Sequence, residues 1–447
     1  MKSKIGLILA AFLGSVNVAL AQSSITIYGL VDIGVMTQTN AGNINQTTWG
    51  SSGSPLNYPG VKNGTVSGAM ANGESQSRIG FKGQEDLGGG TKAIFLLETG
   101  FNPVTGNIAS NGMAGNGAAT SAAQGGDNAL QGILFNRGAY VGVTNEQWGA
   151  LTLGRQQNLM LENIGNYNPV NAQMFSPIAF SGTYGGGGYT DSATVNQAIK
   201  YELKQAGFNA KALYATGGIA GNFTAGAVSG LQLGYENARW GIQAIASHAA
   251  DATSLTGATA TGAAGSLMTS AQLAGTSPIV PANALNVTLS NTTAYQLTSK
   301  FQVTDSLNIK AGYEREIIGP PSDFRWYANM PMTVSGFAIA SMTANKTSKA
   351  INVYWVGANY SFTPTIIGSI GYYYASTPQT QGVAQGVQQF QSAMLDYYWS
   401  KRTNLYLGIM NTNTSGASVQ PLPAGSMLSG KTVSTQQTYG AGMRHTF

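Results

Sequence analysis

The side chains that most often perform catalysis or bind metals are few in this chain. It has two histidines, His248 and His445, and no cysteine. His445 belongs to an alternating terminal segment, and His248 shares one side of a predicted strand with Trp240 and Ile242, so neither is positioned to activate a serine. No HExxH pattern occurs, and Gly185–Gly188 lacks the lysine and helix of a phosphate-binding loop. We therefore predict a protein that is not an enzyme and has no metal site and no cofactor.

Charged side chains show a clearer pattern. Arg78 and Lys82 alternate with Ile79 and Phe81, and Glu98 alternates with apolar residues in the next segment. Such alternation is typical of a β-strand with one apolar and one polar face. A charge that faces hydrocarbon costs about 2 to 4 kcal/mol at mid-membrane, so in a membrane-spanning sheet these charges would line a water-filled interior.

The elements that would position these charges are short alternating segments without helical periodicity. There are about sixteen of them, each of roughly membrane-spanning length. They are residues 25–35, 76–84, 92–101, 135–144, 149–155, 194–203, 208–217, 228–236, 240–248, 292–303, 307–317, 349–362, 365–376, 389–399, 403–412 and 435–447. The sequence therefore predicts an all-β fold, an antiparallel transmembrane β-barrel of about sixteen strands.

Connections of two lengths alternate along the chain. Tight turns, such as Glu85–Gly89 and Thr363–Pro364, alternate with long loops rich in small and polar residues. The long loops are residues 37–75, 102–134, 156–193, 249–291, 319–348 and 413–434. Short periplasmic turns and long extracellular loops are typical of outer-membrane barrels, and both termini then lie on the periplasmic side.

The two ends of the chain predict export to the outer membrane. Residues 1–21 combine two lysines, an apolar stretch and a small-residue cleavage site, which predicts a signal peptide and a barrel domain at 22–447. After residue 21 no run of about eighteen apolar residues occurs, which excludes a membrane-spanning helix. The last segment ends in an aromatic residue and predicts an assembly signal. Its outward members are Tyr439, Ala441, Met443, His445 and Phe447.

Composition fits this interpretation. The chain has 60 glycines, 21 tyrosines and only 9% charged residues. Its formal charge of +5 includes Lys2 and Lys4, so removal of residues 1–21 leaves +3, which is too small to indicate a nucleic-acid partner. Aromatic residues gather beside turns, where rings would form girdles at the membrane interfaces. They are Trp148, Tyr201, Trp240, Tyr360, Tyr397, Tyr398, Trp399 and Phe447.

Several stretches resemble the general diffusion porins of Gram-negative bacteria, in particular the trimeric porins of β-proteobacteria. They are residues 24–32 (SITIYGLVD), 77–90 (SRIGFKGQEDLGGG), 136–143 (NRGAYVGV), 151–156 (LTLGRQ) and the ending 444–447 (RHTF). The resemblance implies a homotrimeric channel for ions and small hydrophilic solutes, in which the third extracellular loop folds into the lumen. It also implies contact with outer-membrane lipid and lipopolysaccharide, and with the barrel assembly machinery through the last strand.

In such porins, arginines on the wall face acids on the inward loop, which would be residues 156–193 here. The resulting field orients permeating solutes. The resemblance places Arg78 and Arg137 on the wall, and we expect a constriction that also contains Glu162 and Thr194. Further residues expected to line the pore are Asp32, Lys82, Glu98, Arg155, Lys200 and Glu202.

Three of these assignments leave alternatives open. Arg137 faces the pore directly if Tyr140 faces lipid, whereas a lipid-facing Val141 would require a bulge in the strand. Arg155 either contributes to the pore or bonds loop carbonyls. Lys200 and Glu202 either line the lower lumen or pair with each other.

The chain departs from the family at the expected constriction. Thr194 stands where many relatives have arginine, and the inward loop has two acids, Glu162 and Asp191. We therefore predict weak charge selectivity with a modest anion bias, and we expect position 194 to face the lumen. A substrate-specific channel or a surface adhesin or phage receptor is the alternative function, for which residues 323–327 offer a loop rich in aromatic and charged groups.

Overall fold

The computed structural model describes residues 24–39, 65–106, 108, 134–177, 194–217, 223–224, 226–258, 285–320, 348–378, 385–416 and 435–447. The predicted signal peptide, Asp191 and the loop at 323–327 lie outside these residues. Within the described ranges, no helix combines the length and the apolarity needed to cross a membrane.

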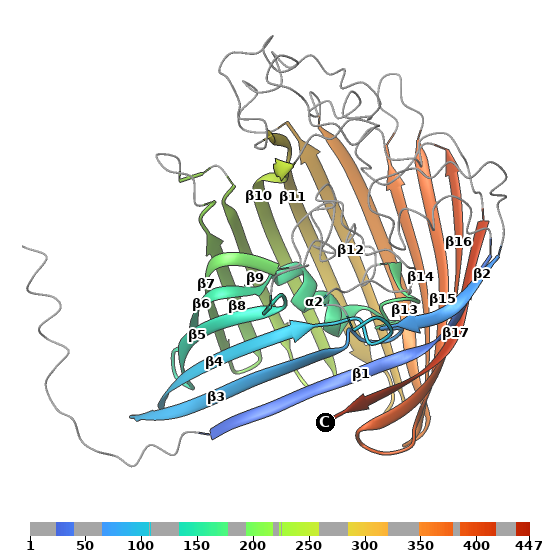
Figure 1. Cartoon of the computed structure of the whole chain (residues 1–447), viewed down its shortest axis with the longest axis horizontal. Helices are drawn as coiled ribbons and strands as arrows, with labels where there is room; N and C mark the ends of the chain where they lie inside the picture. Colours follow the sequence, from blue (N-terminus) through green and yellow to red (C-terminus); the bar gives the residue numbers. More distant parts are fainter. Residues whose placement is uncertain are drawn as a thin grey trace, which may run out of the picture.

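The described strands form one closed antiparallel sheet (Figure 1). From β3 to β17 each strand pairs with the next strand in sequence, β1 (Ser24–Gln38) pairs with both β2 and β3, and β1 also pairs with β17 (Thr435–Thr446) to close the ring. The others are β2 (Val66–Ala71), β3 (Arg78–Gly88), β4 (Thr91–Gly100), β5 (Gly138–Asn145), β6 (Gly149–Gln157), β7 (Thr194–Gln205), β8 (Phe208–Ala215), β9 (Val228–Glu236), β10 (Trp240–Ala258), β11 (Leu285–Gln302), β12 (Leu307–Gly319), β13 (Lys349–Thr363), β14 (Ile366–Thr377), β15 (Gly386–Tyr398) and β16 (Thr403–Gly416).

The barrel has sixteen strand positions, although the sheet contains 17 strands. Strand β2 pairs with the second half of β1, Ile33–Gln38, and β3 pairs with the first half, Ser24–Leu30. These two strands therefore share one position, and 17 minus one gives sixteen. The predicted fold class and strand number are confirmed. Figure 1 also shows that β10–β16 rise above the ends of β3–β6, so the wall is lower on the β3–β6 side.

Two of the loops were predicted to be longer than they are, because strands occupy part of the predicted ranges. Strand β2 lies inside the loop expected at 37–75. The loop expected at 249–291 is shorter because β10 continues to Ala258 and β11 begins at Leu285. Small residues hide the alternation in β2 and at the end of β10, since Gly and Ala contrast weakly with their polar neighbours, whereas the start of β11 alternates Leu285, Val287 and Leu289 with polar residues and could have been recognised. Strand β2 and the end of β10 are defined by their pairing partners more than by their own sequence.

Side chains alternate between an exposed outer surface and an inner surface of the barrel. On β6, for example, Leu151 and Leu153 are 44% and 54% exposed, whereas Thr152 and Gln156 are buried. Aromatic rings beside the turns are exposed as predicted, including Trp148, Trp240 and Phe447. Tyr398 is an exception, because it shares the inner face with Asp396 and is only half-buried.

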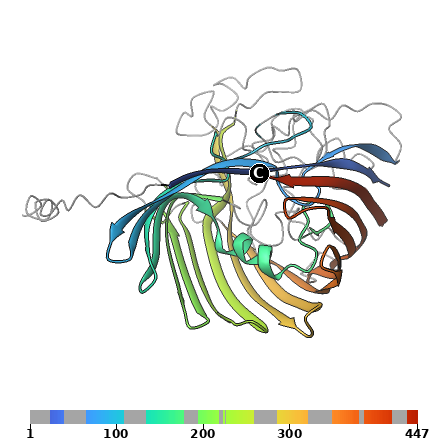
Figure 2. The ribbon, with the colours of Figure 1, turned by 90° about the horizontal axis from the view of Figure 1, so that it is seen from below.

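The inward loop contains a helix that the alternation analysis missed. Helix α2 (Leu159–Tyr167) begins after Asn158, whose side-chain oxygen accepts a hydrogen bond from the Leu161 N–H at 2.8 Å. Seen from below, α2 lies inside the ring of strands (Figure 2). The described part of this loop, residues 158–177, therefore folds into the barrel as predicted.

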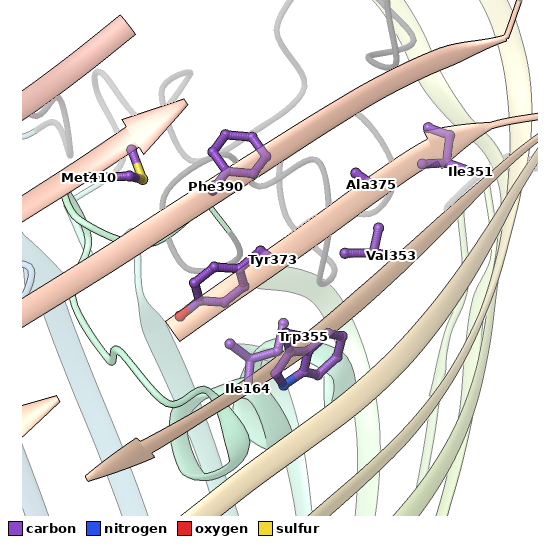
Figure 3. Close-up of a cluster of buried hydrophobic side chains, with 8 residues drawn as sticks. All are labelled: Ile164, Ile351, Val353, Trp355, Tyr373, Ala375, Phe390 and Met410. Carbon is purple, nitrogen blue, oxygen red and sulfur yellow. The ribbon is translucent and has the colours of Figure 1, made fainter. Parts of the chain in front are cut away.

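Three apolar clusters fix the inward loop to different parts of the inner wall. Leu159 and Met160 pack against a group that includes Val195 and Ile245 on β7 and β10. Ile164 packs among inner-wall side chains of β13–β16, as Figure 3 shows. The third cluster joins Val170, Ala172, Met174 and Phe175 of the loop to Met36, Met70, Met394 and Tyr406 of the wall. The loop thus crosses the lumen and is attached on both sides of it.

Candidate functional site

An arginine cluster lies on the inner wall around the segment between β2 and β3. Glu98 accepts hydrogen bonds from Arg137 Nε at 2.6 Å and from the Tyr28 hydroxyl at 2.8 Å, and its Oε2 is 3.6 Å from Arg78 Nε. The side-chain oxygen of Gln76 is a further acceptor for Arg137, and the Gln76 carbonyl accepts from Arg78 at 3.4 Å. Two arginines therefore share one carboxylate on the inner surface.

The open question about Arg137 is answered by its place just before the strand. Val141 is 58% exposed and faces lipid, so strict alternation would turn residue 137 outward. Strand β5, however, begins at Gly138, and the Arg137 N–H donates to the Glu98 carbonyl at 3.2 Å. Because residue 137 precedes the regular strand, its side chain reaches inward without a bulge in β5.

A second polar network lies beside the arginine cluster, where the barrel closes. Arg444 Nη1 is 2.6 Å from Glu74 Oε1 and 3.0 Å from Ser75 Oγ. Asn404 links Arg444, Glu74 and Asp396 through its amide group. Arg444, on β17, was not predicted as a site residue. Its inward direction could have been found from the outward alternation of Tyr439, Met443 and Phe447.

Asp32 belongs to this network and does not line the pore, which corrects the prediction. Its side chain is 0% exposed. One carboxylate oxygen accepts from the backbone N–H groups of Glu74 and Ser75 at 2.8 and 2.6 Å, and the other accepts from the Tyr406 hydroxyl at 2.5 Å. These contacts hold residues 72–77 against the wall. Because Gln76 in this segment accepts hydrogen bonds from Arg78 and Arg137, Asp32 has a structural role in positioning the arginine cluster.

Glu162 of α2 pairs with lysines on the near wall. Its Oε1 is in contact with Lys200 Nζ, and its Oε2 is 2.7 Å from Lys211 Nζ. Glu202 lies 3.6 Å from Lys211 and 2.8 Å from Lys204, so Lys200 and Glu202 do not pair directly with each other. The charge of Glu162 is thus compensated locally, and the carboxylate anchors the helix to β7 and β8. Lys211 was not predicted.

Thr194 and Arg155 lie on the outer face, which corrects the prediction for Thr194 and the pore-lining alternative for Arg155. Gly154 pairs with Ala198 but Gln156 pairs with Val195, so β7 has an extra residue there, and Gln197 has a φ of 54°. This bulge reverses the alternation on which the prediction depended. Val195 therefore packs inward against the loop, and Thr194 turns outward.

Arg155 shares the outer face with Leu151 and Leu153 and donates hydrogen bonds to groups on neighbouring segments. It donates to the carbonyl of Asn136 at 2.7 Å, to Asn196 Oδ1 at 2.5 Å and to Thr194 Oγ1 at 2.6 Å. The contact with Asn136 agrees with the alternative in which Arg155 bonds a loop carbonyl.

The remaining predicted residues occupy ordinary strand positions. Lys82 is exposed on the inner face, with Nζ 5.0 Å from the centre of the Tyr28 ring. His248 and His445 lie on the outer face, where their Nδ1 atoms are 2.8 Å from the hydroxyls of Thr293 and Thr403. Among the described residues, no three His, Cys, Asp or Glu side chains gather as metal ligands would.

The end of α2 meets a further set of polar groups on β9, β11 and β12. The Tyr167 hydroxyl donates to Glu236 at 3.1 Å, and Lys300 is 2.6 Å from the other oxygen of Glu236. Burial raises the pKa of Tyr167 to about 12, so its hydroxyl remains a donor at neutral pH. Lys310 donates to the carbonyl of Asn168 at 3.1 Å. Basic groups thus line the inner wall on both sides of the inward loop.

A profile described as Gram-negative porin matches residues 7–328, which is more than half of the chain. The chain belongs to the Gram-negative porin family. An outer membrane porin protein of Bordetella pertussis is 33% identical over 165 residues, 37% of this chain and 35% of that protein. Outer membrane porin protein 32 of Delftia acidovorans is 31% identical over 215 residues, 47% of this chain and 49% of that protein. The chain thus matches about a third to a half of the length of these relatives.

Solved structures of porins have the same fold. The anion-selective porin from Comamonas acidovorans superposes with a TM-score of 0.60 at 18% identity, and the match covers 95% of this chain and 100% of that one. OmpT of Vibrio cholerae in its trimer form gives a TM-score of 0.55 at 10% identity, covering 95% of this chain and 99% of that one. This porin is an outer-membrane β-barrel, and its residues that face lipid and lumen can be assigned on that basis.

Proposed function

We propose that this porin forms a water-filled channel for passive diffusion of ions and small hydrophilic solutes, with a modest preference for anions. The observation that carries the anion bias is the pair Arg78 and Arg137, which share the single carboxylate of Glu98. The side chains of the two arginines are 29% and 15% exposed, so part of their charge is accessible from the lumen. A wall with more cations than acids attracts anions. No catalytic step is part of the proposal.

The bias is expected to be modest because most other charges are compensated. Glu162 and Glu202 are paired with Lys200, Lys211 and Lys204, and Glu236 is paired with Lys300. The field across the constriction is therefore expected to come mainly from the arginine cluster and from the network beside it, where the acids Glu74, Asp32 and Asp396 outnumber Arg444 and reduce the anion bias.

Replacing Arg78 by Ser tests the anion bias. The reversal potential in a KCl gradient is expected to move toward lower anion preference, most clearly at low salt, where screening is weakest. Lys401→Ser is the matched control, because Lys401 lies in an exposed turn between β15 and β16. Equal reversal potentials for native and Arg78→Ser channels would show that Arg78 does not contribute to charge selectivity at the constriction.

Liposome swelling with a series of neutral sugars tests general diffusion. The rate is expected to decline smoothly as solute size increases. A single sugar that enters far faster than its size predicts would favour a substrate-specific channel instead.

We further propose that residues 1–21 are removed on export, that 22–447 form the porin domain, and that it assembles as a homotrimer. The trimer form of the Vibrio cholerae relative and the outward position of Arg155 support the trimer. A charged group facing hydrocarbon is unfavourable, and a second copy of the chain would cover it.

Site-specific cross-linking tests the trimer. The chain has no cysteine, so Val141→Cys on β5 and Leu231→Cys on β9 each introduce one thiol. These residues are 58% and 50% exposed, and Val141 lies close to Arg155 on the low side of the wall. We expect a thiol-specific cross-linker to join copies of Val141→Cys and not of Leu231→Cys. Absence of cross-linked species for both would contradict this interface.

A further inference from the structure

Strands β1 and β17 are the first and last strands of the sheet, so no hairpin turn fixes how they pair. Figure 1 shows them side by side, and Gln38 and Thr438, which are register partners in this seam, are 400 residues apart in the chain. Within a hairpin, the length and type of the turn set the register. The register of the seam therefore depends on contacts between side chains.

The outward side chains of the seam specify its register only weakly. Ile33 and Val35 on β1 and Met443 on β17 are exposed apolar residues. Because side chains alternate with a period of two, a shift by two residues would keep all three on the outer surface. Gly34 pairs with Gly442, and glycine-rich strands are prone to such shifts. The outer face therefore does not distinguish the observed register from one shifted by two residues.

The inner side chains of the seam form a row across three strands. Asp32 on β1 is the register partner of Arg444 on β17, which is in turn the partner of Asn404 on β16. Glu74 contacts the last two, because its Oε1 is 2.6 Å from Arg444 Nη1 and its Oε2 accepts from Asn404 Nδ2 at 2.8 Å. The segment that contains Glu74 is thereby joined to β16 and β17.

Tyr406 reaches across β17 to β1. It lies on β16, and its hydroxyl donates to Asp32 Oδ1 at 2.5 Å, although β17 lies between the two strands. A Cβ placed on Gly442 of β17 would be 2.2 Å from this hydroxyl oxygen. The tyrosine therefore passes over a glycine, and its hydrogen bond spans the seam.

These contacts divide into two groups that move as units. Asp32 accepts from the backbone N–H groups of Glu74 and Ser75, so residues 74 and 75 belong to the β1 side. Asn404, Tyr406 and Arg444 belong to the β17 side. A shift by two residues would place Asp32 opposite Gly442 or Thr446, about 7 Å from its present position along the strand. Every contact between the two groups would then be lost.

The loss would be costly because the groups are buried. Asp32, Glu74, Asn404 and Tyr406 are all shielded from solvent. A buried carboxylate without its hydrogen-bond partners is strongly unfavourable. The inner face, unlike the outer face, thus distinguishes the observed register from its neighbours.

We propose that these five residues, which we call the seam cluster, select the register in which the barrel closes. Asp32 and Glu74 on one side meet Asn404, Tyr406 and Arg444 on the other only in the observed register. Buried polar groups are known to fix the register of packed elements in this way. Since residues 72–77 also hold Gln76 beside the arginine cluster, correct closure positions that cluster as well. The proposal depends on the closed barrel and not on the channel activity.

Cysteine pairs across the seam measure the register, because the chain has no cysteine of its own. Ile33→Cys with Met443→Cys reports the observed register, in which the two Cα atoms are about 5.5 Å apart and a disulfide can form. Ile33→Cys with Ala441→Cys, or with His445→Cys, reports a shift by two residues, because these Cα atoms are roughly 9 Å apart in the observed register. In porin refolded into detergent under oxidising conditions, we expect a disulfide in the first pair and not in the other two.

Tyr406→Phe, which removes only the hydroxyl, is then combined with each cysteine pair. We expect the shifted disulfides to increase by about tenfold, since a hydrogen bond to a charged group contributes that much. Tyr373→Phe is the matched control. It removes the hydroxyl of another buried inner-wall tyrosine, which donates to Asn168 of the inward loop at 2.7 Å, and it is expected to leave the disulfide pattern unchanged.

Arg444→Gln provides a second variant of the seam cluster, and it is expected to give shifted disulfides as well. If Tyr406→Phe and Arg444→Gln form only the Ile33–Met443 disulfide, the cluster does not select the register and the proposal is overturned, even where less barrel is recovered. If a variant does not fold, forming the Ile33–Met443 disulfide before refolding is expected to restore the barrel, because the register is then fixed covalently. Failure of this disulfide to restore folding would also overturn the proposal.

Discussion

At the scale of single residues, Glu162 links the inward helix to the wall and also balances two lysines. Its carboxylate oxygens contact Lys200 and Lys211, whose side chains are 11% and 13% exposed. Partly buried charges are screened less by salt than exposed ones, so the balance among these three groups affects the potential in the lumen.

Replacing Glu162 by Gln is expected to increase anion preference. The amide is neutral, so Lys200 and Lys211 lose their compensating charge, while an amide oxygen can still accept one hydrogen bond and keep α2 attached. Reversal potentials in a KCl gradient measure the effect. Glu146→Gln, in the turn between β5 and β6, is the control and is expected to behave like the native channel. A shift toward cations in Glu162→Gln would contradict the proposed charge balance.

Whether a side chain faces the inside or the outside of the barrel could be predicted wherever its strand is regular. Arg78 and Lys82 lie on β3, and Glu98 lies on β4. These two strands pair without a register shift over that region, so the alternation gave the correct inward direction for all three side chains. Alternation failed at Thr194, because a one-residue bulge at Gln197 cannot be read from the sequence TVNQA. Lys211 escaped notice for a different reason, since its partner Glu162 lies on another element and sequence spacing contains no information about that contact.

At the scale of elements, the inward loop depends on small residues in the strands it touches. A Cβ placed on Gly408 of β16 would lie 2.4 Å from a ring atom of Phe175, well inside contact distance. Phe175 itself is 0% exposed and packs edge-on against Tyr406, with ring centroids 6.5 Å apart. A glycine is therefore needed at position 408 for the end of the described loop to pack on the wall.

Replacing Gly408 by Val is expected to displace the loop around Phe175 and raise single-channel conductance. Overpacking of this kind typically costs about 1 to 3 kcal/mol, which is enough to release a local contact but less than a barrel of this size requires to unfold. Gly165→Ala is the control, since a Cβ there meets nothing within 4 Å and alanine favours a helix. If Gly408→Val conducts like the native channel, Phe175 does not help to set the width of the pore.

Elements differed in how well sequence could predict them. Strands with contrasting faces, such as β3, β6 and β12, were predicted because their alternation is strong. Helix α2 was missed because its buried positions, Leu159, Met160, Asn163, Ile164 and Tyr167, include an asparagine and span only nine residues. Asn163 is buried because Gln296 and Thr298 of the wall accept its hydrogen bonds at 2.6 and 2.9 Å, and these partners are distant in sequence.

At the scale of the whole molecule, the barrel closes through its first and last strands. Strand β17 pairs with β1 from Leu30↔Thr446 to Gln38↔Thr438. Phe447 extends this ladder by one pair, because its N–H donates to the Gly29 carbonyl at 3.0 Å and its carbonyl accepts from the Gly29 N–H at 3.2 Å. The ring of Phe447 lies over Gly29, where a Cβ would be 2.4 Å from Cζ.

The outward side chains of β17 support its proposed role as the assembly signal. Tyr439, Met443 and Phe447 are 45%, 44% and 47% exposed, and His445 is exposed on the same face. Before closure the strand would present this alternating surface and an unpaired edge, which is the form that another protein's sheet can bind by strand addition.

Deleting Phe447 is expected to reduce the amount of assembled porin in the outer membrane sharply, because the deletion removes two hydrogen bonds of the closing pair and the aromatic end of the proposed signal. Phe447→Tyr keeps the backbone bonds and the ring, so near-native assembly is expected for it. Heat-modifiable migration of membrane fractions measures assembly. Gly29→Val leaves the terminal residue in place and disturbs the Phe447 ring together with the β1–β3 pairing, because a Cβ at residue 29 would also lie 2.5 Å from the Arg78 carbonyl oxygen. If Gly29→Val assembles normally and the deletion does not, the terminal residue acts as a signal; if both assemble normally, neither the terminal residue nor its contact with β1 is required.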